Sequence, residues 1–162
     1  VRYLGQLADV VRPLRLAIEA PVELGIQDEQ LTVMRRLRDG LRMVPHPAPL
    51  LIADEWCNTL DDVRAFAKAE AADMVQIKMP DLGPVGDSIE AALICRQQGI
   101  GAYLGGSCNE TDISARLAVH VAAATGCHQM LARPGMGVDE GVSIMRNELA
   151  RLRHWLRTHP TA

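Results

Sequence analysis

Short apolar runs alternate with longer amphipathic runs along the chain, and this alternation limits the possible folds more than any other feature. The two kinds of run have the periodicities of strands and helices. Strand–helix–strand units of about 25–35 residues form right-handed parallel connections. We therefore predict strands at Leu14–Glu19, Leu51–Asp54, Met74–Lys78, Gly101–Leu104 and Gln129–Ala132. Helices are predicted near Asp28–Met43, Asp61–Ala71, Val85–Gln98, Asp112–Thr125 and Val138–Leu156.

Local signals agree with several of these helix boundaries. Thr59 with Asp62 three residues later has the pattern of a capping box, and Thr111 directly precedes another predicted helix. Gly99 and Gly126 lie just past two helices, where a residue in the left-handed conformation is favoured.

Two α/β folds fit the alternation, a doubly wound sheet and a TIM-type (β/α) barrel. No GxGxxG motif follows a predicted strand, which counts against a dinucleotide-binding doubly wound fold. Glu19, Asp54 and Lys78 end three successive strands. Barrel enzymes carry their catalytic residues at that position, so we predict a TIM-type barrel.

The length of the chain is too short for a complete barrel. A (β/α)₈ barrel takes about 250 residues, whereas this chain has 162. Five open parallel strands would leave two unpaired edges and one uncovered face. We therefore expect residues 1–162 to form about the last five β/α units of a barrel domain.

Composition excludes several classes of partner. The formal net charge is -3, and 48% of the residues are hydrophobic. No electrostatic feature predicts binding to nucleic acid or to an anionic membrane. No apolar run reaches the roughly 20 residues of a membrane-spanning helix. The four cysteines form no CxxC pair, so reduced thiols in a cytoplasmic protein are the simplest interpretation.

The strand that ends at Lys78 carries the first candidate catalytic group. Side chains alternate along a strand, so Gln76 and Lys78 share one face, which in a barrel points into the mouth. A lysine there acts as a general base if its pKa is lowered by desolvation or by a nearby cation. The alternative is a solvated lysine at a strand end.

Glu19 and Asp54 end the two preceding strands. Carboxylates on adjacent strands can share a hard cation such as Mg²⁺, which prefers oxygen ligands. The alternative is that both carboxylates cap helix N-termini.

The two remaining predicted strands end at candidate binding segments. In the segment after the fourth strand, paired glycines allow the backbone to approach a ligand closely. Ser107 and Cys108 there offer N–H groups and small side chains suited to a carboxylate. A plain turn with a helix cap is the alternative. At the fifth strand, Met130 and Leu131 point to opposite faces, so one of them points inward, and ordinary core packing is favoured for Met130.

Five segments together resemble the methylaspartate ammonia-lyase family of the enolase superfamily. They occur in the family's order and run through nearly the whole chain. They are IEAP with Glu19, ADEWCNT with Asp54, MVQIKMPDLG with Lys78, GAYLGGSCNET with Cys108, and QMLARPGMGVDEG with Leu131. Departures from the family pattern are Ala20 in place of Gly, Ser107 in place of Thr and Arg133 in place of Lys.

The resemblance implies a role for each candidate residue. Glu19 and Asp54 match the second and third of three Mg²⁺ ligands, and Lys78 matches the base lysine. The first ligand, a second base that is a histidine, and an N-terminal lid domain have no counterpart in this sequence. The implied substrate-binding residues are Gln76, Ser107, Cys108 and Leu131.

The resemblance also implies an activity and an assembly. The expected reaction is reversible elimination of ammonia from the amino acid L-threo-3-methylaspartate to give mesaconate. Mg²⁺ is the expected cofactor, K⁺ the expected activator, and a cytoplasmic homodimer the expected assembly. We expect the isolated chain to have little or no activity. The alternatives are another enolase-superfamily enzyme, such as a dehydratase or cycloisomerase, and a non-catalytic barrel scaffold.

Overall fold

The computed structural model describes residues 1–44, 48–132 and 135–160. In these ranges five parallel strands form one sheet in the order β1-β2-β3-β4-β5. Each strand pairs with the next one along the chain, as in the wall of a barrel. The strands are β1 (Ala17–Glu19), β2 (Leu50–Ala53), β3 (Met74–Ile77), β4 (Gly101–Leu104) and β5 (Gln129–Met130).

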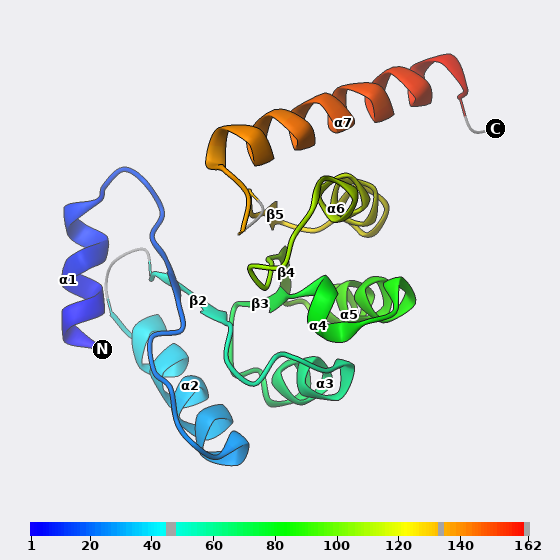
Figure 1. The fold of residues 1–162 in the computed structure, drawn as a ribbon. Coiled ribbons are helices and arrows are strands. Elements are labelled where there is room, and N and C mark those ends of the chain that lie inside the picture. Colours follow the sequence, from blue (N-terminus) through cyan, green and yellow to red (C-terminus); the bar gives the residue numbers. More distant parts are fainter. Residues whose placement is uncertain (45–47, 133–134, 161–162) are drawn as a thin grey trace.

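Helices connect the strands and cover one face of the sheet. Figure 1 shows α2, α3, α5 and α6 following one another along one side of the curved sheet, with α7 beside α6. The five strands therefore form an open half-barrel, as the sequence predicts. The helices are α1 (Arg2–Val10), α2 (Gln27–Arg42), α3 (Leu60–Ala69), α4 (Met79–Leu82), α5 (Val85–Gln97), α6 (Asp112–Thr125) and α7 (Val138–Thr158).

The two faces of the sheet have different surroundings. Val75 and Ile77 of β3 belong to the large core packed under the helices. The opposite face carries a smaller apolar cluster of Ile52, Met74 and Tyr103, which come from three neighbouring strands. This alternation places Gln76 on the face opposite the helices, as the sequence predicts.

Most predicted boundaries agree with the structure. The five predicted helices correspond to α2, α3, α5, α6 and α7, with no boundary shifted by more than two residues. Capping boxes are present at Thr59 and Thr111. Gly99 and Gly126 have φ of 70° and 75°. None of the described helices is both long and apolar enough to cross a membrane.

The predicted first and last strands are too long. Residues 14–16 lie outside β1, where Leu14 is 74% exposed. The last strand ends at Met130, although the N–H of Leu131 still donates to the carbonyl of Leu104 (2.9 Å). The short helix α4 was not predicted. Arg133, a departure from the family pattern, lies outside the described residues.

Candidate functional site

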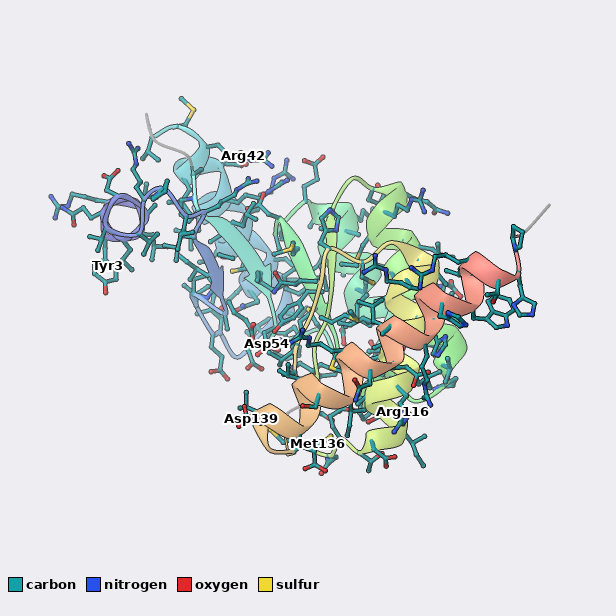
Figure 2. All side chains as sticks on the ribbon, turned by 90° about the horizontal axis from the view of Figure 1, so that it is seen from above. Tyr3, Arg42, Asp54, Arg116, Met136 and Asp139 are labelled. Carbon is teal, nitrogen blue, oxygen red and sulfur yellow. The ribbon has the colours of Figure 1, made fainter. Side chains whose placement is uncertain are left out.

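The C-terminal ends of β1, β2 and β3 meet at one edge of the sheet, which we call the carboxyl rim. Glu19 is the last residue of β1, and Asp54 and Lys78 directly follow β2 and β3. Parallel pairing of the three strands puts these ends side by side. Four side chains therefore project from neighbouring strands at this rim, and we call them the rim cluster: Glu19, Asp54, Gln76 and Lys78. Asp54 is labelled in Figure 2.

An ion pair joins two members of the rim cluster. The Nζ atom of Lys78 lies 2.8 Å from Oδ1 of Asp54, and the two side chains are 12% and 20% exposed. The same ammonium donates to the backbone carbonyl of Asp54 (3.2 Å) and to Oδ1 of Asn58 (3.4 Å). The Lys78 side chain is thus held over the loop that follows β2, which disagrees with the alternative of a freely solvated lysine.

The pKa of Lys78 differs from what a general base requires. Burial lowers the pKa, but the hydrogen bond and the charge of Asp54, with smaller contributions from Glu55 and Cys57, outweigh burial and raise it. The lowered pKa that a general base needs is therefore not produced by the groups of this chain alone. The reason is that the nearest charge to Lys78 is a carboxylate rather than a cation.

Glu19 belongs to the same electrostatic cluster. The residue remains exposed, but partial desolvation and then the charge of Asp54 raise its pKa, while the Gln76 hydrogen bond and the Lys78 charge act in the opposite direction. The Nε2 atom of Gln76 donates to Oε1 of Glu19 (2.7 Å). Two carboxylates therefore lie near enough to repel each other, and the ammonium of Lys78 lies near enough to both to act on them electrostatically.

The loop that follows Glu19 and the loop that carries Asp54 are braced against each other. The indole N–H of Trp56 donates to the carbonyl of Leu24 (2.8 Å), which joins the loop after β2 to the loop after β1. The buried Gln30 side chain holds the same loop, since it accepts from Leu24 N and donates to Val22 O, both at 2.9 Å. These contacts fix the relative position of the two carboxylates.

The loop after β4 approaches the rim cluster through a glycine. A Cβ atom on Gly105 would lie within 2.4 Å of the Gln76 side chain, so only glycine fits under this glutamine. At Gly105 the space is thus taken by the Gln76 side chain, and the predicted close approach of this backbone to a ligand stays a prediction. Ser107 and Cys108 follow, and within the described residues no hydrogen bond joins either of them to the rim cluster. The buried Ser107 hydroxyl has no partner there.

The segment after β5 packs against the same loop. A Cβ atom on Gly135 would lie 2.3 Å from the carbonyl oxygen of Cys108. Leu131 packs against the apolar cluster of the inner face, whereas Met130 packs against the core under the helices. Leu131 is therefore the inward residue of the pair, and the core interpretation of Met130 is confirmed.

Sequence reasoning missed three residues of this region. Asn58 contacts Lys78, and Trp56 and Gln30 brace the two loops. Asn58 lies four residues after Asp54, so proximity along the chain was a usable signal. The contacts of Trp56 and Gln30 depend on loop conformations that the sequence does not indicate. Trp56 itself has φ of 59°, which is uncommon for a residue other than glycine.

The donor set of the rim cluster suits a hard cation. Glu19 and Asp54 offer carboxylate oxygens only, and Mg²⁺ commonly uses one or two carboxylates and completes its shell with water or substrate oxygens. Among the described residues no group of three or more His, Cys, Asp or Glu side chains is arranged to hold a metal. The two carboxylates thus offer oxygen ligands for part of a coordination shell and no complete site within the described residues.

Comparison with known proteins gives one consistent family. Residues 1–158 match the family model for the C-terminus of methylaspartate ammonia-lyase. Methylaspartate ammonia-lyase 1 of Carboxydothermus hydrogenoformans is 52% identical over 149 residues, which cover 92% of this chain and 35% of that protein. The chain thus spans about a third of the length of the curated relatives it matches.

Solved structures agree with the sequence match. A Mg complex of beta-methylaspartase from Clostridium tetanomorphum superimposes with a TM-score of 0.90 at 44% identity, over 94% of this chain and 37% of that one. Methylaspartate ammonia lyase from Citrobacter amalonaticus, which contains (2S,3S)-3-methylaspartic acid, gives a TM-score of 0.92 at 42% identity. That match covers 96% of this chain and 38% of the other.

Proposed function

Since the chain belongs to the methylaspartate ammonia-lyase family, we propose that it is the C-terminal part of an ammonia-lyase that converts L-threo-3-methylaspartate reversibly to mesaconate and ammonia. In this proposal residues 1–162 contribute part of a (β/α)₈ catalytic barrel. The observation that carries the proposal is the convergence of Glu19, Asp54 and Lys78 on one rim, with an ion pair of 2.8 Å within it. The solved relative that contains (2S,3S)-3-methylaspartic acid supports the substrate class.

Lys78 is the proposed base. The reaction requires removal of the proton at C3, which is weakly acidic because a carboxylate is attached to that carbon. Only the neutral amine accepts a proton, so the ion pair with Asp54 must open before Lys78 acts. Asn58 and the backbone carbonyl of Asp54 can hold the amine near the rim when the carboxylate is engaged elsewhere.

Glu19 and Asp54 are the proposed Mg²⁺ ligands of this chain. A magnesium ion bound to them would supply Lewis-acid stabilisation of negative charge that develops on a substrate carboxylate. The oxygen-only donor set fits this ion, and a solved relative is a Mg complex. Gln76 orients Glu19 through the 2.7 Å hydrogen bond.

The remaining candidates line the proposed substrate site. Ser107 has a buried hydroxyl without a partner among the described residues, which makes it available to a substrate oxygen. Cys108 follows it with an exposed side chain. Leu131 extends the apolar inner face beside Tyr103 and offers a wall for the methyl group of the substrate.

The family resemblance adds three expectations. We expect the complete enzyme to be activated by K⁺ and to form a cytoplasmic homodimer. We expect the isolated chain to have little or no activity. Measurable ammonia release from the isolated 162 residues would contradict the last of them.

Deuterium exchange at C3 of methylaspartate tests the role of Lys78 in the complete enzyme. Loss of a general base typically costs about 10²–10⁴-fold in rate. We expect Lys78→Ala to lower exchange by that factor on the face that Lys78 serves. The control is Lys68→Ala, which removes an exposed lysine from α3 and should leave exchange unchanged. Undiminished exchange in Lys78→Ala would end the assignment.

A further inference from the structure

The opposite edge of the same strands carries a second cluster of charges, which we call the amino rim. Arg15 precedes β1, Leu50 begins β2 and Asp73 directly precedes β3. Arg38 and Arg42 reach this edge from the C-terminal half of α2. Figure 2 shows Arg42 well separated from Asp54, so this cluster is not part of the candidate active site.

A small hollow lies among these side chains. Its volume is about 200 Å³, and Arg15, Arg38, Arg42 and Asp73 line it together with the apolar segment 48–50. Sites for organic ligands usually have volumes of about 300–1,000 Å³. The hollow therefore suits a compact ligand rather than a large organic molecule.

The positive charge around the hollow exceeds the negative charge. Three guanidinium groups face one carboxylate, that of Asp73. Both oxygens of this carboxylate already accept hydrogen bonds. Its Oδ1 accepts from Nε of Arg38 (2.9 Å) and from Arg42 (3.3 Å), and its Oδ2 accepts from the backbone N–H of Leu51 (2.9 Å). Glu70 adds one exposed carboxylate, 3.5 Å from Arg38.

The three arginines differ in how they are held. Arg38 is buried, with its side chain 9% exposed, and is fixed by Asp73 and by the carbonyl of Glu70 (2.7 Å). Arg42 is half-exposed, and its contact with Asp73 is long. For Arg15 no ion pair is found among the described residues. One rigid and two incompletely neutralised guanidinium groups thus surround the hollow.

We propose that the amino rim binds a compact oxyanion, of which inorganic phosphate is the simplest example. Guanidinium groups present paired N–H donors that match the oxygens of phosphate and carboxylate. Arg38 supplies a fixed side of the site, and Arg15 and Arg42 close on the anion. Because this edge of the sheet is opposite the carboxyl rim, the anion stabilises the half-barrel without competing for the substrate site.

Phosphate titration of the 162-residue chain tests this proposal, with calorimetry and thermal unfolding as readouts at constant ionic strength. The expected result is saturable one-to-one binding and a rise in Tm with phosphate concentration. Arg15→Gln and Arg42→Gln should each weaken binding about tenfold, because each removes a charge-assisted hydrogen bond. Circular dichroism first verifies that both variants fold.

The matched control is Arg153→Gln, which removes an exposed arginine from α7. It should bind phosphate as tightly as the parent chain. A titration that does not saturate, an equal response to chloride, or an equal loss of affinity in Arg153→Gln would overturn the proposal, since each would mean that only non-specific charge is involved.

Discussion

The two ends of the same three strands carry the same kind of ion pair in opposite circumstances. At the amino rim, Asp73 has both oxygens occupied by guanidinium and backbone donors. At the carboxyl rim, Asp54 pairs with one largely buried ammonium, that of Lys78, and the neighbouring Glu19 has a raised pKa. A saturated carboxylate contributes to folding, whereas a pair of crowded carboxylates is a cost that binding of a cation can offset.

Left-handed backbone conformations are more frequent at the carboxyl rim but are not confined to it. Ala20, Trp56 and Cys108 lie in the loops after β1, β2 and β4 and have φ of 43°, 59° and 63°, whereas Glu70, with φ of 49°, precedes β3 at the amino rim. Such left-handed conformations are costly for residues other than glycine and gather at functional sites. The difference between the two ends therefore lies mainly in the carboxylates, which crowd each other at the carboxyl rim and are fully paired at the amino rim.

The largest expected difference in stability follows removal of the buried arginine at the amino rim. Arg38→Ala leaves Asp73 without its best partner and should lower the free energy of unfolding by about 3–5 kcal/mol. Urea unfolding measures this value. Lys78→Ala serves as the comparison at the carboxyl rim and should cost far less. Equal losses of unfolding free energy in Arg38→Ala and Lys78→Ala would contradict the proposed difference between the two rims.

The residues of the carboxyl rim could be predicted from the sequence, whereas those of the amino rim could not. Glu19, Asp54 and Lys78 were recognisable because ionisable residues followed three apolar runs at barrel spacing. Arg38 and Asp73 are 35 residues apart along the chain, and an amphipathic helix with several arginines gave no reason to choose one of them. Long-range pairing of this kind depends on the packed fold.

The brace between the first two rim loops is expected to have the next largest effect. Trp56→Phe retains an aromatic ring but removes the indole N–H that donates to the carbonyl of Leu24. The loss of one hydrogen bond should lower the free energy of unfolding by about 1–2 kcal/mol and weaken Mg²⁺ binding, because Asp54 and Glu19 would no longer be held in register. Calorimetry with Mg²⁺ separates the two effects. Unchanged affinity would show that the brace serves stability alone.

A third charged cluster tests whether a saturated carboxylate always stabilises the fold. Glu148 of α7 is 9% exposed and lies between Arg116 (3.0 Å) and His120 (2.9 Å) of α6, with Arg151 also in contact. Figure 2 shows Arg116 beside the two helices. Hydrogen bonds from His120 and Arg151 are the main reasons that the pKa of Glu148 falls from 4.5 to about 2.

Since the folded-state pKa of Glu148 lies below the unfolded value, the stabilisation is present above pH 4.5 and is lost as the pH falls toward about 2. Its partners are partly exposed, so the expected contribution is about 1 kcal/mol. Denaturant unfolding as a function of pH measures it. Glu148→Gln should flatten the profile in this range, and an unaltered profile would contradict the interpretation.

The smallest expected effect is a gain. Ala20 has φ of 43°, a left-handed conformation that favours Gly. Ala20→Gly should relieve strain next to Glu19 and raise the free energy of unfolding by about 0.5–1 kcal/mol, after the greater entropy of the unfolded chain is subtracted. The exposed Ala150→Gly, in the interior of α7, should instead lower it. A loss of stability in Ala20→Gly would mean that the loop is not strained.

The central claim is that Glu19 and Asp54 converge so that one cation engages both, and a Mg²⁺ titration of this chain tests it most directly. The account predicts stabilisation of about 1.4 kcal/mol when free Mg²⁺ is about tenfold above its dissociation constant. Glu19→Gln and Asp54→Asn should each abolish that gain, while Glu90→Gln on the outer surface of α5 should retain it. Absence of Mg²⁺-dependent stabilisation, or its persistence in Glu19→Gln, would contradict the account.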